Sequence, residues 1–509
     1  MPLAALSGLL AGALGVGLSE LLAGVVNGAP SLILSIGSLV ISRQPPGAKQ
    51  FVVDLFGDAD KLVLNLAVLV IALLIGAGLG ILALRSRVLA SIGFVAIGVL
   101  ALVASLGDTL VDPILAVLSV VLAVGTSLTA LPWLLRAASP TADEPEAERL
   151  DFDRRRFLGG TVALAGVAVG SGIIGRVLLE GRSSAAAAVP PVPEPGSTAA
   201  PLPSGVDLDV EGISPIVTPN DRFYRIDTKL LVPRLEAATW RLEVNGMVDR
   251  PFSLDYEELL SMPLVEQYTT IACVSNEVGG RLVGNALWRG ARLRDLLDRA
   301  GVQEGATQVV GRSYDGWTAG FPTAWVDDPG REALVAVAMN GETLPPEHGF
   351  PARLIVPGLY GYVSATKWIT NIELTRFEDF DGYWVPLGWA KEAPILTQSR
   401  IDVPKRSQGL DPGTVPVAGV AWAPDRGIDR VEVQVDDGGW NEAELSAPIS
   451  DATWVQWLFR WDARPGNHTL RVRATDGTGE TQTMEVSEPA PDGARGYHEI
   501  SVFVRGPGA

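Results

Sequence analysis

A single cysteine, Cys273, is the only thiol in this sequence of 509 residues. It lies in the run TIACVSNEVGG at residues 270–280, where a strand-like apolar pattern leads into a glycine-containing loop. Buried cysteines are often no more than small apolar core residues. Beside a histidine base a thiolate can act as a nucleophile, and as a soft ligand it can bind a metal or a metal-containing cofactor. All three interpretations fit Cys273 taken alone.

The small number of cysteines and histidines excludes several classes of site. One cysteine cannot form an intrachain disulfide, a zinc ribbon or a cysteine-ligated iron–sulfur cluster, and the sequence has no C-x-x-C-H haem motif. The three histidines are His348, His468 and His498, so residues 1–136 cannot supply two histidine ligands to a haem. We therefore expect no haem and no iron–sulfur cluster in this chain.

Six short motifs around and after the cysteine occur in an order that is informative. They are NDRFYR at 220–225, ACVSN at 272–276, LWRGARLRDLL at 287–297, MNGETLP at 339–345, HGFPAR at 348–353, and VPG at 356–358 leading to Lys367 and Trp368. In order and spacing they resemble the sulfite-oxidase family of molybdopterin enzymes. The resemblance covers residues 213–505, because the segment IDRVEVQVDDGGW at 428–440 resembles the immunoglobulin-like domain that ends this family.

The resemblance implies a molybdenum–molybdopterin site. Cys273 matches the family cysteine whose thiolate binds molybdenum, and we assign catalysis to it together with Arg225. His348 and Arg353 match the pair that holds the anionic end of the cofactor, a role that suits the fork of a guanidinium. The other matched positions are expected to contact the cofactor: Asn220, Tyr224, Arg225, Ser313, Ser364, Thr366 and Lys367.

Departures from the family pattern bear on the substrate. Sulfite oxidases carry two arginines soon after the metal-binding cysteine, which help to bind a dianion, and the matching residues here are Glu277 and Val278. An Asn-His pair after the first-loop arginine corresponds to Ile226 and Asp227. Because an anion buried without a cationic partner is costly, we expect weak binding of sulfite. Reduction of a sulfoxide or an N-oxide fits these residues better.

The elements that must carry this site begin with apolar helices. Residues 62–84, 88–106 and 114–135 contain no charged residue, and each reaches the length of about 20 residues that crosses about 30 Å of hydrocarbon. Residues 1–42 fit either two crossings or one crossing and an interfacial segment. With a last apolar run at 157–175, the sequence predicts four or five spans within residues 1–136 and one more within 137–182, five or six in all.

Basic residues predict how these spans are oriented. Arg85, Arg87, Arg136 and residues 154–156 flank loops that should face the cytoplasm. The motif RRRFL at 154–158 resembles a twin-arginine export signal, although an ordinary basic stop before a helix explains it equally well. The last span then leads outward. We therefore expect a multi-pass protein of the cell membrane with its catalytic domain on the extracytoplasmic side.

The rest of the chain is acidic. The charges of residues 1–136 cancel, so the formal net charge of −18 belongs to residues 137–509 and argues against nucleic-acid binding. Residues 183–212 are an Ala/Pro-rich linker, and its stretch 183–203 is predicted to be a disordered tether.

Two globular parts are expected after the linker. Residues 213–403 mix strand and helix patterns, including a helix at 254–260 capped by Ser253 with Glu257 near the capping-box position, and a second at 293–300. Residues 404–505 contain short alternating strands separated by glycine-rich turns. The predicted fold is multidomain: N-terminal transmembrane α-helices, an α+β sulfite-oxidase-like molybdopterin domain, and an immunoglobulin-like β-sandwich.

The function that follows is that of a membrane-anchored molybdopterin-dependent oxidoreductase. It would transfer an oxygen atom on a small sulfur- or nitrogen-containing substrate and exchange electrons with a separate cytochrome or quinone-linked partner. A homodimer through the C-terminal domain is left open. Two alternatives predict different behaviour: a cofactor-free membrane-anchored binding protein contains no molybdenum, and a cysteine hydrolase pairing Cys273 with His348 is active without metal.

Overall fold

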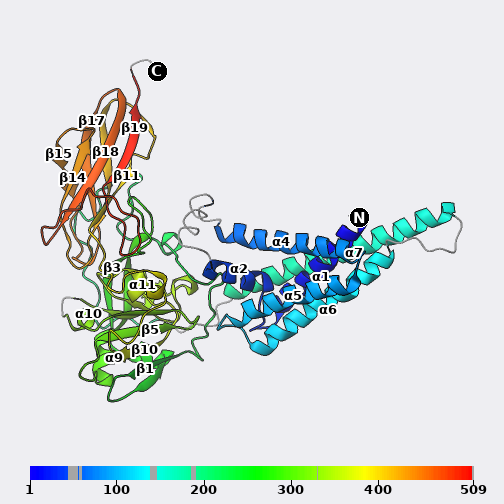
Figure 1. Cartoon of the computed structure of the whole chain (residues 1–509). Coiled ribbons are helices and arrows are strands. Elements are labelled where there is room, and N and C mark those ends of the chain that lie inside the picture. Colours follow the sequence, from blue (N-terminus) through cyan, green and yellow to red (C-terminus); the bar gives the residue numbers. More distant parts are fainter. Residues whose placement is uncertain (44–55, 57–59, 138–145, 185–190, 329–330, 507–509) are drawn as a thin grey trace. The chain divides into compact units, whose positions relative to one another are not determined.

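The computed structural model describes residues 1–43, 56, 60–137, 146–184, 191–328 and 331–506. The chain forms two compact units. One comprises Met1–Ala187 with Thr228–Val232, and the other comprises Ala188–Asp227 with Pro233–Ala509. Figure 1 shows the first unit as helices and the second as a largely β-structured part.

The first unit is built from apolar helices, which are α1 (Pro2–Val25), α2 (Leu32–Arg43), α4 (Asp60–Leu82), α5 (Arg87–Leu106), α6 (Pro113–Ala137) and α7 (Glu146–Ser184). All but α2 contain a stretch of 20 to 25 residues that is long and apolar enough to cross a membrane. Helix α2 has 12 residues, too few for a crossing. Of the two alternatives for residues 1–42, the structure fits one long helix followed by a short one.

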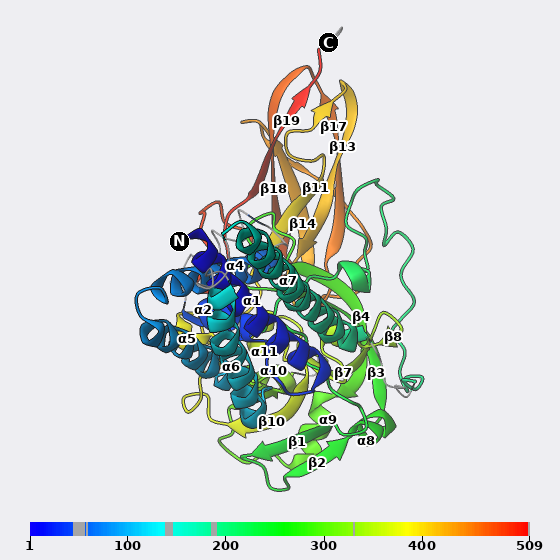
Figure 2. The same cartoon turned by 90° about the vertical axis from the view of Figure 1, so that its right-hand side faces the viewer.

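Small residues allow α1 to approach its neighbours closely. It packs against α4, α6 and α7 (Figure 2). A Cβ atom added at Gly24 would lie 2.4 Å from the carbonyl oxygen of Gly175 in α7, a closeness typical of helix pairs in membranes. Glu20 of α1 is buried and accepts a hydrogen bond of 2.7 Å from the Ser31 hydroxyl, just before α2. This carboxylate links the first two helices.

The second unit begins with an α+β part that contains two sheets. The first sheet has the order β2-β1-β10-β5-β6, with β1 (Arg241–Gly246), β2 (Phe252–Asp255), β5 (Gln308–Ser313), β6 (Thr318–Pro322) and β10 (Ile369–Thr375). The second has the order β3-β4-β7-β8, and β9 also pairs with β7; these strands are β3 (Leu264–Ala272), β4 (Val283–Arg292), β7 (Leu334–Met339), β8 (Glu342–Thr343) and β9 (Arg353–Ile355). In both views the β1 sheet lies farther from the C-terminal strands than the β3 sheet does.

Short helices connect these strands: α8 (Tyr256–Ser261), α9 (Leu293–Ala300), α10 (Ala324–Asp327) and α11 (Gly361–Ser364). Helix α9 has the predicted bounds. Helix α8 begins later than predicted, because residues 252–255 extend β2 and the capping box is formed by Asp255 with Glu258. The predicted cap at Ser253 with Glu257 is therefore wrong.

The C-terminal part consists of two sheets around one apolar core. One has the order β11-β13-β17-β16, with β11 (Gln398–Val403), β13 (Gly413–Trp422), β16 (Glu444–Leu445) and β17 (Val455–Ala463). The other has the order β12-β19-β18-β14-β15, with β12 (Gly409–Leu410), β14 (Ile428–Val435), β15 (Trp440–Glu442), β18 (Gly466–Asp476) and β19 (His498–Val504). Trp457 and Val472, one from each sheet, share a buried cluster. Strand β11 pairs with β13, so residues 398–403 belong to the C-terminal sheets. The boundary between the α+β part and the C-terminal part therefore lies before residue 398, and not after residue 403 as predicted.

The predicted tether is partly ordered against the α+β part. Ser197 forms a parallel bridge with Val265 of β3, and the Glu266 amide donates to the Ser197 carbonyl at 2.9 Å. The Arg289 side chain donates to the Pro193 carbonyl at 2.8 Å. These contacts give residues 193–197 defined partners, so the prediction of a disordered tether is wrong for this stretch.

Candidate active site

Cys273 follows directly after the last residue of β3. All nine residues of β3 pair with β4, so the strand end is held firmly. The Cys273 amide donates to the Leu282 carbonyl at 2.9 Å, and the Asn276 amide donates to the Cys273 carbonyl at 3.0 Å. The Asn276 side chain in turn accepts from the Leu282 amide at 2.7 Å. The cysteine is 8% exposed, and its backbone is fixed on both sides by the loop that it opens.

Tyr224 of the first loop interacts electrostatically with this cysteine, and Phe223 packs against Tyr224. The rings of Phe223 and Tyr224 stack at 5.3 Å, and Phe223 also contacts Trp288 and His348 edge-on. A Cβ atom added at Gly361 would lie 3.7 Å from the Tyr224 hydroxyl. Burial raises the pKa of Tyr224 and the negative charge of a Cys273 thiolate raises it further, while Arg353 opposes both. The phenol therefore stays protonated and lies within reach of both charges.

Arg353 is a buried cation at the centre of this group. It lies at the start of β9 and is 5% exposed, with its guanidinium 5.1 Å from the centre of the Trp288 ring. Its Nη1 donates to the His348 carbonyl at 3.1 Å, but its Nε has no hydrogen-bond partner among the described residues. Burial lowers the pKa of Arg353 to about 10, so the group is still charged at neutral pH. A buried guanidinium with an unused donor suits an anionic ligand.

His348 has a structural partner of its own. Its Nε2 lies 2.9 Å from the Asn220 carbonyl oxygen. The pKa of His348 is lowered to about 4, mainly by burial, and the charges of Arg353 and Lys367 act in the same direction. The ring is therefore neutral at pH 7 and donates from Nε2 to that carbonyl. The side chain of Asn220 is used within the protein, because it accepts from Asn340 at 2.8 Å and donates to Glu342 at 3.2 Å.

A carboxylate that the sequence did not single out as a site residue joins the two other cations. Asp227 forms ion pairs with both Arg225 and Lys367, and its side chain is 1% exposed. Burial alone would raise the pKa of Asp227, but the charges of Lys367 and Arg225 outweigh it and the pKa lies below its usual value. Burial lowers the pKa of Lys367 to about 8, although Asp227 opposes the change. Asp227 thus compensates much of the positive charge here.

We expect Asp227→Asn to reduce stability by about 3 kcal/mol at pH 7, since removing one partner of a buried ion pair leaves the other charge uncompensated. A depressed carboxyl pKa contributes stability above its unfolded value of about 3.9 and loses it as the pH falls through the folded value. The difference between the two proteins should therefore be full at pH 5 to 7 and shrink below about pH 4. Denaturant unfolding at each pH measures it, and Asp437→Asn, at a fully exposed residue near Arg471, is the matched control. Equal losses from both variants at pH 7 would contradict this account.

The hydroxyl residues divide into two groups. Ser313 at the end of β5 and Thr366 after α11 are buried, and their hydroxyl oxygens have no hydrogen-bond partner among the described residues. The Ser364 hydroxyl, in contrast, donates to the carbonyls of Leu359 and Tyr360 at 3.2 and 3.1 Å. Ser364 thus satisfies its own turn, whereas Ser313 and Thr366 retain unused hydrogen-bonding capacity.

Two further aromatic residues belong to this centre. Trp288 is fully buried between Phe223 and Arg353. Tyr360 is buried, and its pKa is raised by burial and by the charge of Cys273. Both lie inside motifs that the sequence had singled out, at residues 287–297 and 356–368, but their types alone gave no reason to select them.

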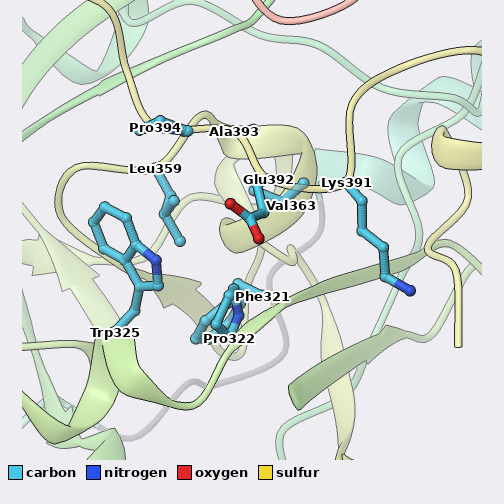
Figure 3. Close-up of a pocket in the computed structure, with 9 residues that line it drawn as sticks. All are labelled: Phe321, Pro322, Trp325, Leu359, Val363, Lys391, Glu392, Ala393 and Pro394. Atoms are coloured by element: carbon cyan, nitrogen blue, oxygen red, sulfur yellow. The ribbon is translucent and has the colours of Figure 1, made fainter. Parts of the chain in front are cut away.

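A separate pocket of about 80 Å³ lies beside α11 (Figure 3). Its lining includes Trp325, Leu359 and Val363, and the Glu392 carboxylate lies among them in the view. Its lining contains none of the ten predicted site residues. The pocket is therefore distinct from the centre around Cys273.

The chain is similar in sequence to known proteins. Residues 229–384 match the family described as oxidoreductase molybdopterin binding domain. The chain is 40% identical over 160 residues to the uncharacterized oxidoreductase YuiH of Bacillus subtilis, covering 31% of this chain and 76% of that protein. It is 30% identical over 320 residues to the sulfite oxidase of Gallus gallus, covering 53% of this chain and 69% of that protein.

These similarities cover only part of each protein. The chain spans about half the length of the mammalian mitochondrial sulfite oxidases that it also matches. Among solved structures, the sulfane dehydrogenase SoxCD from Paracoccus pantotrophus aligns with a TM-score of 0.50 at 23% identity, covering 59% of this chain and 85% of that chain. At that identity the alignment shows a shared fold.

Proposed function

This chain belongs to the sulfite-oxidase family of molybdopterin-dependent oxidoreductases, and we propose that it is a membrane-anchored enzyme that transfers an oxygen atom on a small sulfur- or nitrogen-containing substrate. One observation carries the proposal. A buried soft thiol, Cys273, and a buried guanidinium, Arg353, both interact electrostatically with the same phenol, Tyr224.

The side chains present suit the cofactor that this family implies. The Nε of Arg353 and the hydroxyl oxygens of Ser313 and Thr366 are buried without a partner among the described residues. Leaving a buried polar group unsatisfied costs about 1–3 kcal/mol, so such groups fit a place where a ligand supplies the missing partners. A thiolate suits molybdenum as a soft metal ligand, and a guanidinium fork suits the phosphate of the pterin.

When bound, the molybdenum–molybdopterin cofactor supplies the two-electron oxidation and reduction that oxygen-atom transfer requires. The protein itself would bind the cofactor and orient the substrate. Cys273 holds its thiolate at a fixed strand end, and Arg353 and Lys367 attract the anionic end of the pterin. Tyr224 keeps its proton because its pKa is raised, and so it can donate a hydrogen bond to an oxygen of the substrate. Phe223 and Trp288 exclude water from this side.

Charge compensation around Arg225 favours a neutral substrate. The Arg225 guanidinium is already paired with Asp227, so it attracts a dianion such as sulfite less strongly than an unpaired arginine does. Glu277, beside Val278 in the loop after Cys273, adds a negative charge. We therefore assign the reaction as reduction of a sulfoxide or N-oxide, in which the substrate takes up two electrons and two protons and releases water.

Assays in both directions test this assignment. The molybdenum-loaded protein should oxidise a reduced viologen dye when a sulfoxide or N-oxide is added, with kcat/KM at least about 10-fold above that for sulfite with ferricyanide, a difference of about 1.4 kcal/mol. The opposite preference would overturn the substrate assignment. Activity in neither direction with the loaded protein would overturn the oxygen-transfer function itself.

The hydrolase alternative is disfavoured by His348. A base that activates a thiol works best with a pKa near the working pH, and burial lowers the pKa of His348 to about 4. Its Nε2 is also engaged by the Asn220 carbonyl. A cofactor-free binding protein would not explain why the Arg353 Nε and the Ser313 and Thr366 hydroxyls are buried without a hydrogen-bond partner among the described residues.

The helices, by length and composition, suit an anchor in the cell membrane with the catalytic part on the extracytoplasmic side. A separate cytochrome or quinone-linked protein would exchange the electrons. The C-terminal sheets suit an immunoglobulin-like sandwich and a homodimer contact. The twin-arginine motif lies in α7, outside the residues whose side chains the structure describes.

A further inference from the structure

The loop that follows Cys273 is attached to the C-terminal sheets by a buried arginine. Arg400 of β11 donates from Nη1 to the Gly280 carbonyl at 2.6 Å. Its Nε donates to Asp402 at 2.8 Å and its Nη2 to the Ser214 hydroxyl at 2.8 Å. Arg400 is 6% exposed and Asp402 is 8% exposed. Asp402 and Ser214 thus hold the guanidinium in place, and its remaining nitrogen, Nη1, binds the loop at Gly280.

The ring of His498, in β19, lies against the same loop. Gly279 has a φ of +77°, and a Cβ atom added there would lie 2.3 Å from the His498 ring. The ring is held in turn, because its Nδ1 accepts from the Ile401 amide at 2.9 Å. Burial lowers the pKa of His498 to about 4, so this nitrogen remains an acceptor at neutral pH. The backbone of β11 thus holds the His498 ring, and the ring lies against Gly279.

From Gly280 a short chain of hydrogen bonds leads to the cysteine. The Asn276 carboxamide oxygen accepts from the Leu282 amide, and a Cβ atom added at Gly280 would lie 2.6 Å from this oxygen. The Leu282 carbonyl accepts from the Cys273 amide, and the Cys273 carbonyl accepts from the Asn276 amide. The Gly280 amide donates to the Glu277 carbonyl at 2.8 Å, and Leu282, two residues after Gly280, is bound to both Asn276 and Cys273. We therefore expect a shift of Gly280 to disturb the backbone contacts of Cys273.

We propose that Arg400 is a positioning residue for the metal-binding thiolate: by holding the Gly280 carbonyl, it fixes the loop that orients Cys273, which makes the C-terminal sheets part of the active site. This inference rests on the proposed function for its catalytic consequence, but its structural part does not require the cofactor. Residues that support a metal ligand set its orientation. We therefore expect that losing the contact between Arg400 and Gly280 misorients the Cys273 thiolate and so slows turnover.

The lone cysteine gives a readout that is independent of activity. In the full-length protein prepared without cofactor, alkylation by iodoacetamide can occur at Cys273 alone, and its rate reports how often the loop opens. We expect Arg400→Gln to raise this rate about 10-fold or more over the wild type. Arg400→Lys, which keeps one donor for the carbonyl, should fall between the two.

A matched control separates this effect from the general loss of an ion pair. Arg473 of β18 pairs with Glu432 at 2.9 Å and lies over the Trp440 ring, within the same sheets. Arg473→Gln should therefore leave the alkylation rate unchanged. If Arg400→Gln does not fold, Gly279→Ala tests the same loop through its contact with His498 and should also raise the rate.

In the loaded enzyme, Arg400→Gln should lower kcat by about 10–100-fold with KM changed less than about 3-fold. Wild-type alkylation rates in Arg400→Gln or in Gly279→Ala would overturn the proposal. A raised rate in a protein that never binds molybdenum would leave the loop contact standing and refute the proposed function instead, so the two failures are distinguishable.

Discussion

Cys273→Ser is expected to lower turnover by more than about 100-fold while leaving the fold intact. Serine has nearly the size of cysteine, and the backbone of this position is held by Leu282 and Asn276, so packing should change little. The hydroxyl, however, is a hard and weakly acidic group that replaces a soft thiolate. Loss of a residue that merely supports a metal ligand already costs 10–100-fold, and loss of the ligand itself should cost more.

The measurement combines steady-state kinetics with X-ray absorption at the molybdenum edge. The variant should show one fewer sulfur ligand per molybdenum. Its thermal midpoint should lie within a few degrees of the wild type, as expected for a change in stability of about 1 kcal/mol or less. A variant that keeps both its activity and its sulfur count would show that Cys273 is an ordinary buried residue.

Arg353→Gln is expected to weaken retention of the pterin by about 30-fold or more. Truncating one partner of a buried charged hydrogen-bonded pair costs about 2–5 kcal/mol, and about 2 kcal/mol corresponds to that factor. Arg353→Lys keeps the charge but not the planar fork, so its loss should be smaller than that of the glutamine variant. Pterin extracted per chain after extended dialysis measures the retention.

Arg299→Gln provides the control for this series. Its guanidinium lies 4.0 Å from the centre of the Phe252 ring at an exposed position away from the candidate site, so it matches the arginine–aromatic contact of Arg353 without the burial. Full pterin content is expected in this variant. If Arg353→Gln keeps as much pterin as Arg299→Gln, the guanidinium does not hold the cofactor.

The predicted site residues could be selected from residue type and motif order alone. Cys273 is unique in the chain, and Arg353 and Lys367 lie in ordered motifs, so no contact had to be known to select them. The long helices could be predicted for a similar reason, since a run of apolar residues can be recognised without knowing what it contacts. Helix α9 has its predicted bounds because its apolar residues repeat with helical spacing.

The missing features depend on partners far away in the chain. Asp227 became a member of the site only when the fold brought it to Lys367, 140 residues later. Arg400 reaches Gly280 across 120 residues, and nothing in its local sequence marks it. The cap of α8 was misplaced because strand pairing of β2 with β1 extends to Asp255, a tertiary effect that overrides the local pattern. The order of the motifs thus predicts the chemistry of the candidate site but not the contacts that support it.

The most direct test of the account is the molybdenum and pterin content of the purified full-length protein. It should be expressed in a host that makes the cofactor, with loading of another molybdenum enzyme in the same cells as the reference. The account predicts one molybdenum and one pterin per chain, retained through gel filtration in detergent. Protein that folds and contains neither, from cells in which the reference enzyme is loaded, would contradict it.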